Sequence, residues 1–409
     1  MDKRRILLII FDGLGDRPVT ELGHKTPLEA ARKPNLDWFA ANGVNGLLDP
    51  IAPGVPPGSD TSHLALFGYD PLKVYTGRGP FEAAGVGIDL QAGDIAFRCN
   101  FVTVDEEMRI VDRRAGRIRE GTAELAASLD GMKLGRVRAL FRAGTEHRGA
   151  LVLRGKGLSP DVTDTDPHEH GVAVPDAKAL GPKAKATAKA LNAFTKESYR
   201  RLRDHPVNLA RVARGELPAN IVLCRGAGIF PDIAPITVRH GVRAAGIAGV
   251  ALVRGMCRSV GMDVLDVPGA TGGLETDVVA KAEAALRALE AYDLVVVNVK
   301  AADLCGHDGK ASEKIHAIER MDVMMGHLKS KLPQDVVLAI TSDHSTPVAL
   351  KDHSGDPVPL TIFGEGTRVD DVVSYDERSM ARGGLGRIRG QDVMPLLLDL
   401  AGRSAKFGA

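Results

Sequence analysis

The sequence predicts an α/β protein with a three-layer core, in which a mostly parallel sheet lies between helices, and with a smaller inserted α+β domain. Short runs in the chain are apolar along their whole length, as expected of parallel strands covered on both faces. These runs alternate with helical patterns, which is typical of an α/β core. A stretch from about residue 93 to 174 interrupts the alternation and is rich in arginine.

The core is predicted from six apolar runs and four helical segments. The runs expected to be buried parallel strands are Ile6–Phe11, Ile221–Cys224, Gly249–Val253, Leu294–Val299, Val336–Thr341 and Leu360–Phe363. The helical segments are Lys183–Arg203, Thr276–Ala291, Ser312–Lys331 and Gln391–Leu400. We therefore assign residues 1–92 and 175–409 to the core.

The predicted insert, residues 93–174, has a different pattern. Strands of an antiparallel sheet are expected at Phe97–Val104, Arg109–Asp112 and Ala150–Leu153, with a short helix at Thr122–Leu129 between them. Arginine is dense in this stretch, at positions 109, 113, 114, 117, 119, 136, 138, 142 and 148. Guanidinium groups bind carboxylate and phosphate through two hydrogen bonds, so the insert is a candidate substrate-binding lid.

Composition excludes several classes of protein. The 409 residues are 44% apolar, which is too high for a disordered chain. The 53 basic and 52 acidic side chains leave a charge of +1, so charge gives no argument for nucleic-acid or membrane partners. The four cysteines are scattered and Ile6–Phe11 is too short for a signal peptide, which favours a cytoplasmic protein. Oligomeric state cannot be read from the sequence.

Two candidate residues lie in the N-terminal part of the chain. Asp12 directly follows the first predicted strand, at the end where α/β proteins bind ligands, although an aspartate that only forms a turn is an equal alternative. Ser59 follows a Gly/Pro-rich loop and precedes an apolar stretch, so taken alone it is expected to be a helix N-cap. The same position would stabilise a phosphate on its hydroxyl.

Five further candidate residues lie in the C-terminal half of the chain. Asp303 and His307 are four residues apart, so on a helix they face the same side and can share a metal, although this spacing is common by chance. Asp343 and His344 follow a strongly apolar run, and His353 follows in a loop where no packing demand explains it. The alternative for His344 is a core histidine bound to a backbone carbonyl.

In this order along the chain, Asp12, Ser59, Asp303 with His307, Asp343 with His344, and His353 resemble the alkaline phosphatase superfamily of two-metal phosphoryl-transfer enzymes. Within it, the chain is similar to cofactor-independent phosphoglycerate mutases of the shorter archaeal type. The similarity spans nearly the whole chain and includes the stretches Tyr75–Pro80, Asp112–Ile118, Asp164–His168, Arg225–Gly228, Gly306–Gly309 and Gly383–Gly390.

The resemblance implies a two-metal site with a serine nucleophile. Asp303, His307 and His353 would hold one ion; Asp12, Asp343 and His344 would hold the other, beside the Ser59 hydroxyl. Metal coordination favours the alkoxide of a serine, and two cations neutralise the attacking and leaving oxygens. Three carboxylates with three imidazoles suit Mn²⁺ or Zn²⁺ better than the all-oxygen sites typical of Mg²⁺ or Ca²⁺. Of these ions Mn²⁺ is favoured, and Zn²⁺, Co²⁺ or Mg²⁺ are the alternatives.

The implied activity is the interconversion of 3-phosphoglycerate and 2-phosphoglycerate through a phosphoserine, without bisphosphoglycerate, in glycolysis and gluconeogenesis. The substrate contacts expected are Arg113, Arg117, Arg148 and His168 in the insert, and Arg225 and Lys300 in the core. Another phosphoryl transfer on the same core, by a phosphomonoester hydrolase or a homoserine-kinase-like enzyme, is the alternative. A non-enzymatic protein that kept the fold and lost the metals is disfavoured, because the nucleophile and all six metal ligands that the resemblance implies are present.

Overall fold

The computed structural model describes residues 3–406 and residue 408, and the chain forms two compact units. Unit 1 comprises Met1–Val74 and Ile233–Ala409, and unit 2 comprises Tyr75–Asp232. Each unit has its own sheet.

Unit 1 is built on an eight-stranded sheet with the order β10-β9-β11-β1-β12-β13-β2-β14. Within the described chain, β13 alone runs against its neighbours, and the other pairings are parallel. The strands are β1 (Arg5–Phe11), β2 (Val44–Asp49), β9 (Ala244–Ile247), β10 (Asp263–Val264), β11 (Leu294–Val299), β12 (Val336–Thr341), β13 (Val358–Phe363) and β14 (Gly386–Arg389). This confirms the predicted α/β class with a mostly parallel sheet.

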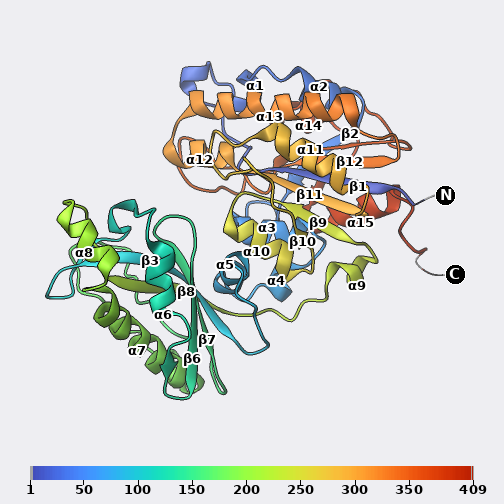
Figure 1. Ribbon diagram of the computed structural model, residues 1–409. Coiled ribbons are helices and arrows are strands. Elements are labelled where there is room, and N and C mark those ends of the chain that lie inside the picture. The colour runs from blue at the N-terminus through green and yellow to red at the C-terminus, as the bar shows by residue number, and fades with distance from the viewer. Residues whose placement is uncertain (1–2, 407, 409) are drawn as a thin grey trace. The chain divides into compact units, whose positions relative to one another are not determined.

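Helices cover both faces of this sheet (Figure 1). One layer contains α1 (Pro27–Ala30), α2 (Pro34–Ala41), α11 (Val278–Ala288), α12 (Ala301–Asp308) and α13 (Ala311–Lys331), and the other contains α3 (Ser59–Leu66), α10 (Ala251–Ser259) and α15 (Gly390–Leu400). The shorter helices of the unit are η1 (Thr20–Leu22), α4 (Pro71–Val74), α9 (Ile236–His240) and α14 (Glu377–Met380). None of the helices described is both long and apolar enough to cross a bilayer.

Strand β1 is buried on both faces because helices lie on each side of it. Leu7, Ile9 and Phe11 pack in one apolar cluster with Met321 and Met325 of α13, while the side chains between them point to the other face. A continuous apolar run is therefore the correct pattern for a strand in this position.

Two strand predictions in unit 1 need correction. Gly249–Val253 was expected to be a strand, but α10 begins at Ala251 and the strand is β9, just before it. Strand β9 has the sequence AAGI. Its glycine, Gly246, leaves room for α10, because a Cβ at this position would lie about 2.5 Å from the Cys257 Sγ. Leu360–Phe363 does form a strand, but β13 is antiparallel, a direction that an apolar run cannot specify.

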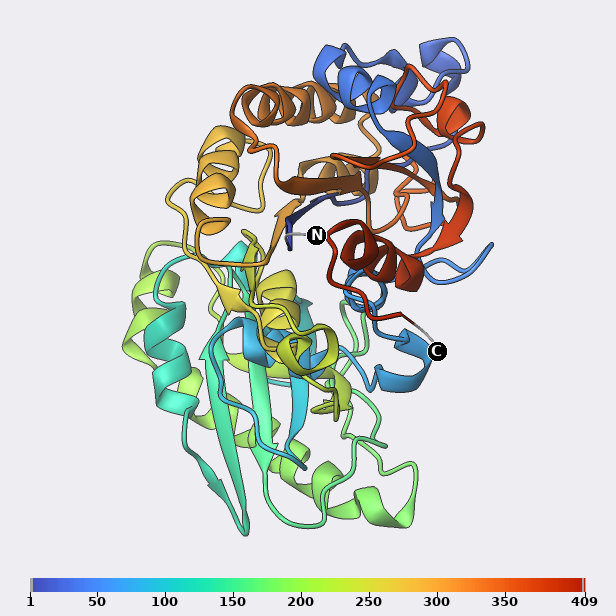
Figure 2. The same ribbon diagram turned by 90° about the vertical axis from the view of Figure 1, so that its right-hand side faces the viewer.

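Unit 2 contains a six-stranded antiparallel sheet, whose long strands are drawn in cyan to green in Figure 2. Strand β3 pairs with β4, β7 and β8, and β7 continues to β6 and β5. The strands are β3 (Ile95–Val104), β4 (Ile110–Asp112), β5 (Lys133–Leu134), β6 (Val137–Ala143), β7 (Arg148–Arg154) and β8 (Ile221–Ile229). The helices are α5 (Gly79–Gly85), η2 (Ala115–Arg117), α6 (Thr122–Leu129), η3 (Pro182–Ala184), α7 (Lys185–Leu202) and α8 (Pro206–Ala213).

The boundaries of unit 2 differ from the predicted insert of residues 93–174. The segment Ile221–Cys224, expected as a parallel core strand, belongs to β8 and pairs antiparallel with β3. The predicted helix Lys183–Arg203 contains α7, whose Leu191 and Phe194 pack into the apolar core of unit 2. Both segments have the composition of core elements, so only their tertiary partners show that they belong to unit 2.

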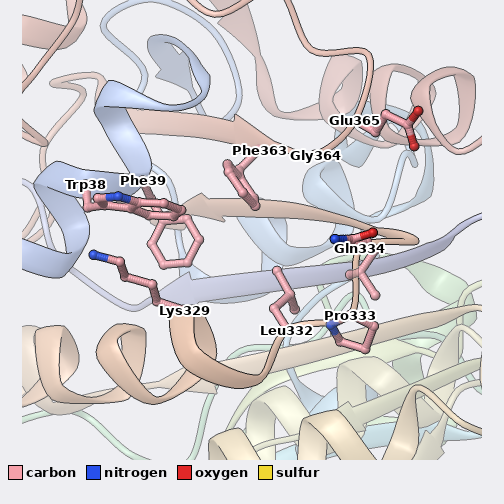
Figure 3. A pocket seen from close by; sticks show the side chains of 10 residues that line it. Trp38, Phe39, Lys329, Leu332, Pro333, Gln334, Phe363, Gly364 and Glu365 are labelled. Carbon is pink, nitrogen blue, oxygen red and sulfur yellow. The ribbon is translucent and has the colours of Figure 1, made fainter.

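A cavity of about 410 Å³ lies in unit 1 at the edge of the sheet where β12 begins (Figure 3). Its aromatic wall consists of Trp38, Phe39 and Phe363, and the Lys329 Nζ lies 4.4 Å from the centroid of the Trp38 ring. Because β12 ends at Thr341, this cavity is at the opposite edge of the sheet from the strand end that precedes Asp343. None of the predicted site residues lines it.

Candidate metal and phosphoryl-transfer site

Three adjacent parallel strands of unit 1 place the predicted acidic residues at one edge of the sheet. Strand β1 lies between β11 and β12, and their carboxyl ends meet at the same edge. Asp12 follows β1, Asp343 and His344 follow β12, and Asp303 and His307 lie on α12, which begins two residues after β11. The fold thus gathers residues that are more than 300 positions apart in the chain.

The loop after β1 is kept close to α12 by Gly13. Its φ of 65° lies in the left-handed region, and a side chain there would lie 2.6 Å from the Asp303 Cα. Glycine therefore permits both the turn and the close approach.

Ser59 is the first residue of α3, and Gly58 occupies the N-cap position that the sequence had suggested for Ser59. The Ser59 Oγ lies 3.0 Å from the His344 Nε2, and the residue is buried. The neighbouring hydroxyls of Thr61 and Ser62 instead donate to the Gly58 carbonyl, at 3.0 and 2.7 Å. Of the three hydroxyls in this turn, only that of Ser59 faces the histidine.

The predicted ligands come together in two groups, which share one histidine. Ligand atoms of Asp12, Asp343 and His344 lie within 4.8 Å of one another, as do those of Asp303, His344 and His353. His307, expected with the second group, has its Nε2 3.4 Å from the Asp303 Oδ1 and 3.2 Å from the His353 Nε2. The predicted nucleophile and all six predicted metal ligands therefore lie in one cluster.

Backbone carbonyls orient two of the imidazoles. The Nδ1 of His307 lies 2.9 Å from the Lys351 carbonyl, and the Nδ1 of His353 lies 2.7 Å from the Pro57 carbonyl. A carbonyl only accepts, so in the neutral ring Nδ1 carries the proton and the Nε2 lone pair points toward Asp303. This is the arrangement expected of histidine ligands to a metal.

The pKa values of the carboxyl and imidazole groups in this cluster are shifted by burial and by the charges around them. Burial opposes ionisation of Asp303, but Lys300 and the nearby histidines outweigh it and hold the pKa of this carboxyl well below its ordinary value. Burial, together with the Asp12 carboxylate, raises the pKa of Asp343 well above its ordinary value. Burial lowers the pKa of His344 well below that of a free imidazole. Burial opposes protonation of His353, but Asp303 and the Pro57 carbonyl outweigh it and raise the pKa of this imidazole.

The donor set fits divalent metal ions. The Asp343 Oδ2 is fully buried and accepts no hydrogen bond from the described residues. An orphaned buried carboxylate oxygen is costly unless a cation occupies the neighbouring space. Carboxylates combined with imidazoles are ligands suited to transition-metal ions.

Lys300, predicted to contact substrate, is part of this cluster. Its Nζ lies 2.7 Å from the Asp12 Oδ1 and 2.6 Å from the Asp303 Oδ2. Burial would lower the pKa of this ammonium, but Asp12 and Asp303 outweigh it and raise the pKa. Lys300 therefore contributes a fixed positive charge and is not a base.

Two polar residues behind the cluster were not predicted from the sequence. The Asn298 Nδ2 lies 3.0 Å from the Asp12 Oδ2 and 3.4 Å from the His63 Nε2, and the His63 Nδ1 lies 2.6 Å from the Ser59 carbonyl. Both residues are buried. His63 lies one turn after Ser59 on α3, so its position on the same face of the helix as the candidate nucleophile was the available signal.

Unit 2 contains a second polar cluster, built on arginines. Arg98 on β3 and Arg225 on β8 are paired in register, and the Nε of each is buried without a hydrogen-bond partner in the described part of the chain. Burial lowers the pKa of Arg98 to about 9 and also lowers that of Arg225. The Glu82 Oε1 lies 3.7 Å from the Arg98 Nε. This cluster offers donors without enough anions to accept them.

Three of the predicted substrate contacts in unit 2 share one acidic residue. Arg113 donates to both oxygens of Asp166, at 2.9 and 2.7 Å. The Arg225 Nε lies 3.8 Å from the Asp166 Oδ2, and the His168 backbone N–H donates to the Asp166 Oδ1. Asp166 thus holds Arg113, His168 and Arg225 together.

The other two predicted contacts are placed differently. Arg148 begins β7, and its charge contributes to the lowered pKa of Arg98. Arg117 is exposed in η2, with a φ of 57°, away from the acidic residue that the three other contacts share. Arg98 itself was missed, although a charged residue in the middle of a strand as apolar as β3 was a usable signal.

Comparisons with known proteins give a consistent result. A family model described as 2,3-bisphosphoglycerate-independent phosphoglycerate mutase matches residues 40–208. A protein named 2,3-bisphosphoglycerate-independent phosphoglycerate mutase 1 from Methanothermobacter thermautotrophicus is 52% identical, with 98% of this chain and 99% of that protein covered. A protein of the same name from Methanocaldococcus jannaschii is 48% identical over the full length of both chains.

Solved structures agree. A structure from Pyrococcus horikoshii is 43% identical over the whole of both chains, with a TM-score of 0.87. The cofactor-independent phosphoglycerate mutase from Thermoplasma acidophilum is 40% identical, with a TM-score of 0.73 and coverage of 98% of this chain and 100% of that one. At this identity and coverage, the chain belongs to the family of 2,3-bisphosphoglycerate-independent phosphoglycerate mutases.

Proposed function

We propose that the protein is an isomerase that interconverts 3-phosphoglycerate and 2-phosphoglycerate without bisphosphoglycerate, with Ser59 as the phosphoryl acceptor. The observation that carries the proposal is the Ser59 hydroxyl, 3.0 Å from the His344 Nε2 and beside two groups of carboxylate and imidazole ligands. A phosphoryl group on this hydroxyl would also lie at the N-terminus of α3, where the helix dipole favours negative charge.

We propose that two divalent ions occupy the site, with Asp303, His307 and His353 as ligands of one and Asp12, Asp343 and His344 as ligands of the other. Bound there, the ions would favour the serine alkoxide and neutralise the charge of the transferring group. Mn²⁺ is the preferred candidate because the ligands mix oxygen and imidazole nitrogen.

The reaction requires two transfers at one serine. In the first, the Ser59 hydroxyl loses its proton as its Oγ–P bond forms, the bond between phosphorus and the C3 oxygen of the glycerate breaks, and that oxygen takes up a proton. In the second, the C2 hydroxyl loses a proton as its oxygen bonds to phosphorus, the Ser59 Oγ–P bond breaks, and the Ser59 oxygen takes up a proton. Lys300 keeps its positive charge throughout, so its role is to offset the negative charge of Asp12 and Asp303.

We propose that unit 2 binds the carboxylate and phosphate of the substrate through Arg98, Arg113 and Arg225. The buried Nε atoms of Arg98 and Arg225 are donors that an anion would satisfy. The predicted lid role of this unit remains a prediction, as do the cytoplasmic location and the place in glycolysis.

The test is direct. Purified protein, loaded with Mn²⁺, is incubated with 3-phosphoglycerate in the absence of bisphosphoglycerate, and enolase coupling follows the 2-phosphoglycerate formed. We expect turnover that a chelator abolishes and Mn²⁺ restores. Full activity in a verified metal-free preparation would refute the metal site, and release of free phosphate in place of 2-phosphoglycerate would indicate a hydrolase.

A second experiment tests whether the phosphoryl group stays with its own glycerate. Two samples of 3-phosphoglycerate, one labelled in the phosphate and the other in the glycerate, are mixed and converted. We expect product molecules that carry one label or the other. Product carrying both labels would show that glycerate leaves between the two transfers.

A further inference from the structure

Thr346 is a fully buried residue that contacts two of the proposed metal ligands. Its Oγ1 lies 3.0 Å from the His344 Nδ1 and 2.9 Å from the Asp303 Oδ1. His344 belongs to both candidate ligand groups, and Asp303 belongs to one of them. A single hydroxyl therefore touches the histidine that the two groups share.

The direction of these two hydrogen bonds follows from the chemistry of the partners. The oxygens of a carboxylate accept hydrogen bonds, and the Lys300 Nζ already lies 2.6 Å from the Asp303 Oδ2. The Thr346 hydroxyl, with its one proton, donates to the Asp303 Oδ1 at 2.9 Å. The lone pair that remains on Oγ1 then accepts from the His344 Nδ1–H.

This direction determines the tautomer of His344. With the proton on Nδ1, the Nε2 carries its lone pair, and Nε2 is the atom 3.0 Å from the Ser59 Oγ and 3.3 Å from the Asp343 Oδ2. His307 and His353 obtain the same tautomer from backbone carbonyls. His344 obtains it from a side chain, so a single substitution can remove the partner.

The backbone around Thr346 is itself held in place. The Thr346 N–H donates to the Gly15 carbonyl at 3.0 Å, and the buried Lys314 Nζ donates to the Thr346 carbonyl at 2.9 Å. The same Nζ also binds Gly15 and Asp16 in the loop that follows β1. The hydroxyl is thus attached to a rigid segment and can orient other groups.

We propose that Thr346 is a positioning residue, which fixes the tautomer and ring orientation of His344 and couples it to Asp303 so that both metal ions bind. This inference rests on the metal site of the proposed function and goes beyond it by assigning a role to a residue that contacts neither metal nor substrate. Partners of metal ligands of this kind typically change metal affinity about 10- to 100-fold when they are removed.

The test compares the hydroxyl with the rest of the side chain. Thr346→Val removes the hydroxyl and keeps the shape, whereas Thr346→Ser keeps the hydroxyl and removes the methyl group. Thr361→Val is the matched control, because Thr361 is equally buried in unit 1 and its hydroxyl donates to the Asn45 Oδ1 at 2.6 Å. Each full-length protein is stripped of metal and titrated calorimetrically with Mn²⁺ alone.

We expect Thr346→Val to bind Mn²⁺ about 10- to 100-fold more weakly than the wild type, with Thr346→Ser within about threefold of the wild type. Thr361→Val should lose thermal stability but keep the wild-type affinity. If Thr346→Val does not fold, Thr346→Ala is compared with Thr346→Ser in the same way.

Three outcomes would overturn the inference. They are equal affinity in Thr346→Val and the wild type, equal weakening in Thr346→Ser and Thr346→Val, and a wild type that binds no Mn²⁺. A wild type that binds Mn²⁺ but does not convert 3-phosphoglycerate would overturn the proposed function alone, because the titration contains no substrate.

Discussion

The two units of the protein carry clusters of opposite electrostatic character. In unit 1, carboxylates and imidazoles gather at the carboxyl ends of parallel strands, and the buried Asp343 Oδ2 accepts no hydrogen bond from the described residues. In unit 2, guanidinium groups gather on an antiparallel sheet, and the buried Nε atoms of Arg98 and Arg225 lack acceptors. Unit 1 therefore needs cations, and unit 2 needs anions.

This difference explains why a phosphorylated acid and divalent metals are the proposed ligands of one chain. Orphaned buried polar atoms are rare in folded proteins, so those present indicate what the site is built to receive. Metals would complete unit 1, and the carboxylate or phosphate of a substrate would complete unit 2. The substitutions below alter one cluster at a time.

The largest effect is expected from Ser59→Ala. Loss of the acceptor hydroxyl should lower kcat at least about 1,000-fold, because the remaining groups have no nucleophile to assist. Mn²⁺ affinity should change far less, since six carboxylate and imidazole ligands remain. The control is Ser62→Ala, whose hydroxyl donates to a backbone carbonyl. A trapped phosphopeptide that maps to Ser62 would contradict the assignment.

Asp343→Asn should disable the cation-binding cluster and leave the arginine cluster intact. The Asp343 Oδ1 accepts from the Gly13 N–H at 3.1 Å, a bond that an asparagine oxygen can retain, but the negative charge is lost. We expect Mn²⁺ affinity to fall about 100-fold or more in a calorimetric titration. Asp370→Asn, at a carboxylate that binds Asn45, is the control. Unchanged affinity in Asp343→Asn would remove Asp343 from the ligand set.

Arg98→Met should weaken the use of substrate and leave the metal site intact. A lost hydrogen bond to a charged group costs about 1.5–3 kcal/mol, so kcat/KM should fall roughly 10- to 100-fold while Mn²⁺ affinity stays constant. Arg138→Met, at an exposed arginine of the same unit, is the control. If kcat/KM is unchanged in Arg98→Met, Arg98 is not a substrate contact, and the proposal that the arginine cluster of unit 2 binds the substrate anion loses its support.

The smallest effect concerns stability in unit 2. Burial, with the charge of Arg148, lowers the pKa of His147 from 6.5 to about 4. Between these values the unfolded chain takes up a proton that the folded chain does not, so stability falls as pH falls through this window. The loss is at most about 3 kcal/mol, and His147→Asn should remove it from urea titrations between pH 7 and pH 4. The exposed His316 provides the control, since His316→Asn should leave the acid dependence in place.

The candidate metal site was predicted almost completely from the sequence. Asp12, Asp343 and His344 follow strands whose apolar runs are unmistakable, and parallel strands bring their carboxyl ends together. Each of these motifs was weak on its own, and the ligand set was assigned from the resemblance of their order along the chain to a known family. The apolar runs themselves predicted the class of the fold, because each core strand is covered on both faces.

Other features depended on the tertiary structure. The sequence could not show that β8 and α7 belong to unit 2, or that β13 runs antiparallel, because a buried apolar run has the same pattern in any sheet and direction. The roles of Arg98, Asn298 and Thr346 also depended on distant partners, which touch them only after folding. The sequence therefore determined which residues are the candidates for the chemistry, whereas the tertiary structure decided which residues orient them, since orientation is a property of contacts between segments far apart in the chain.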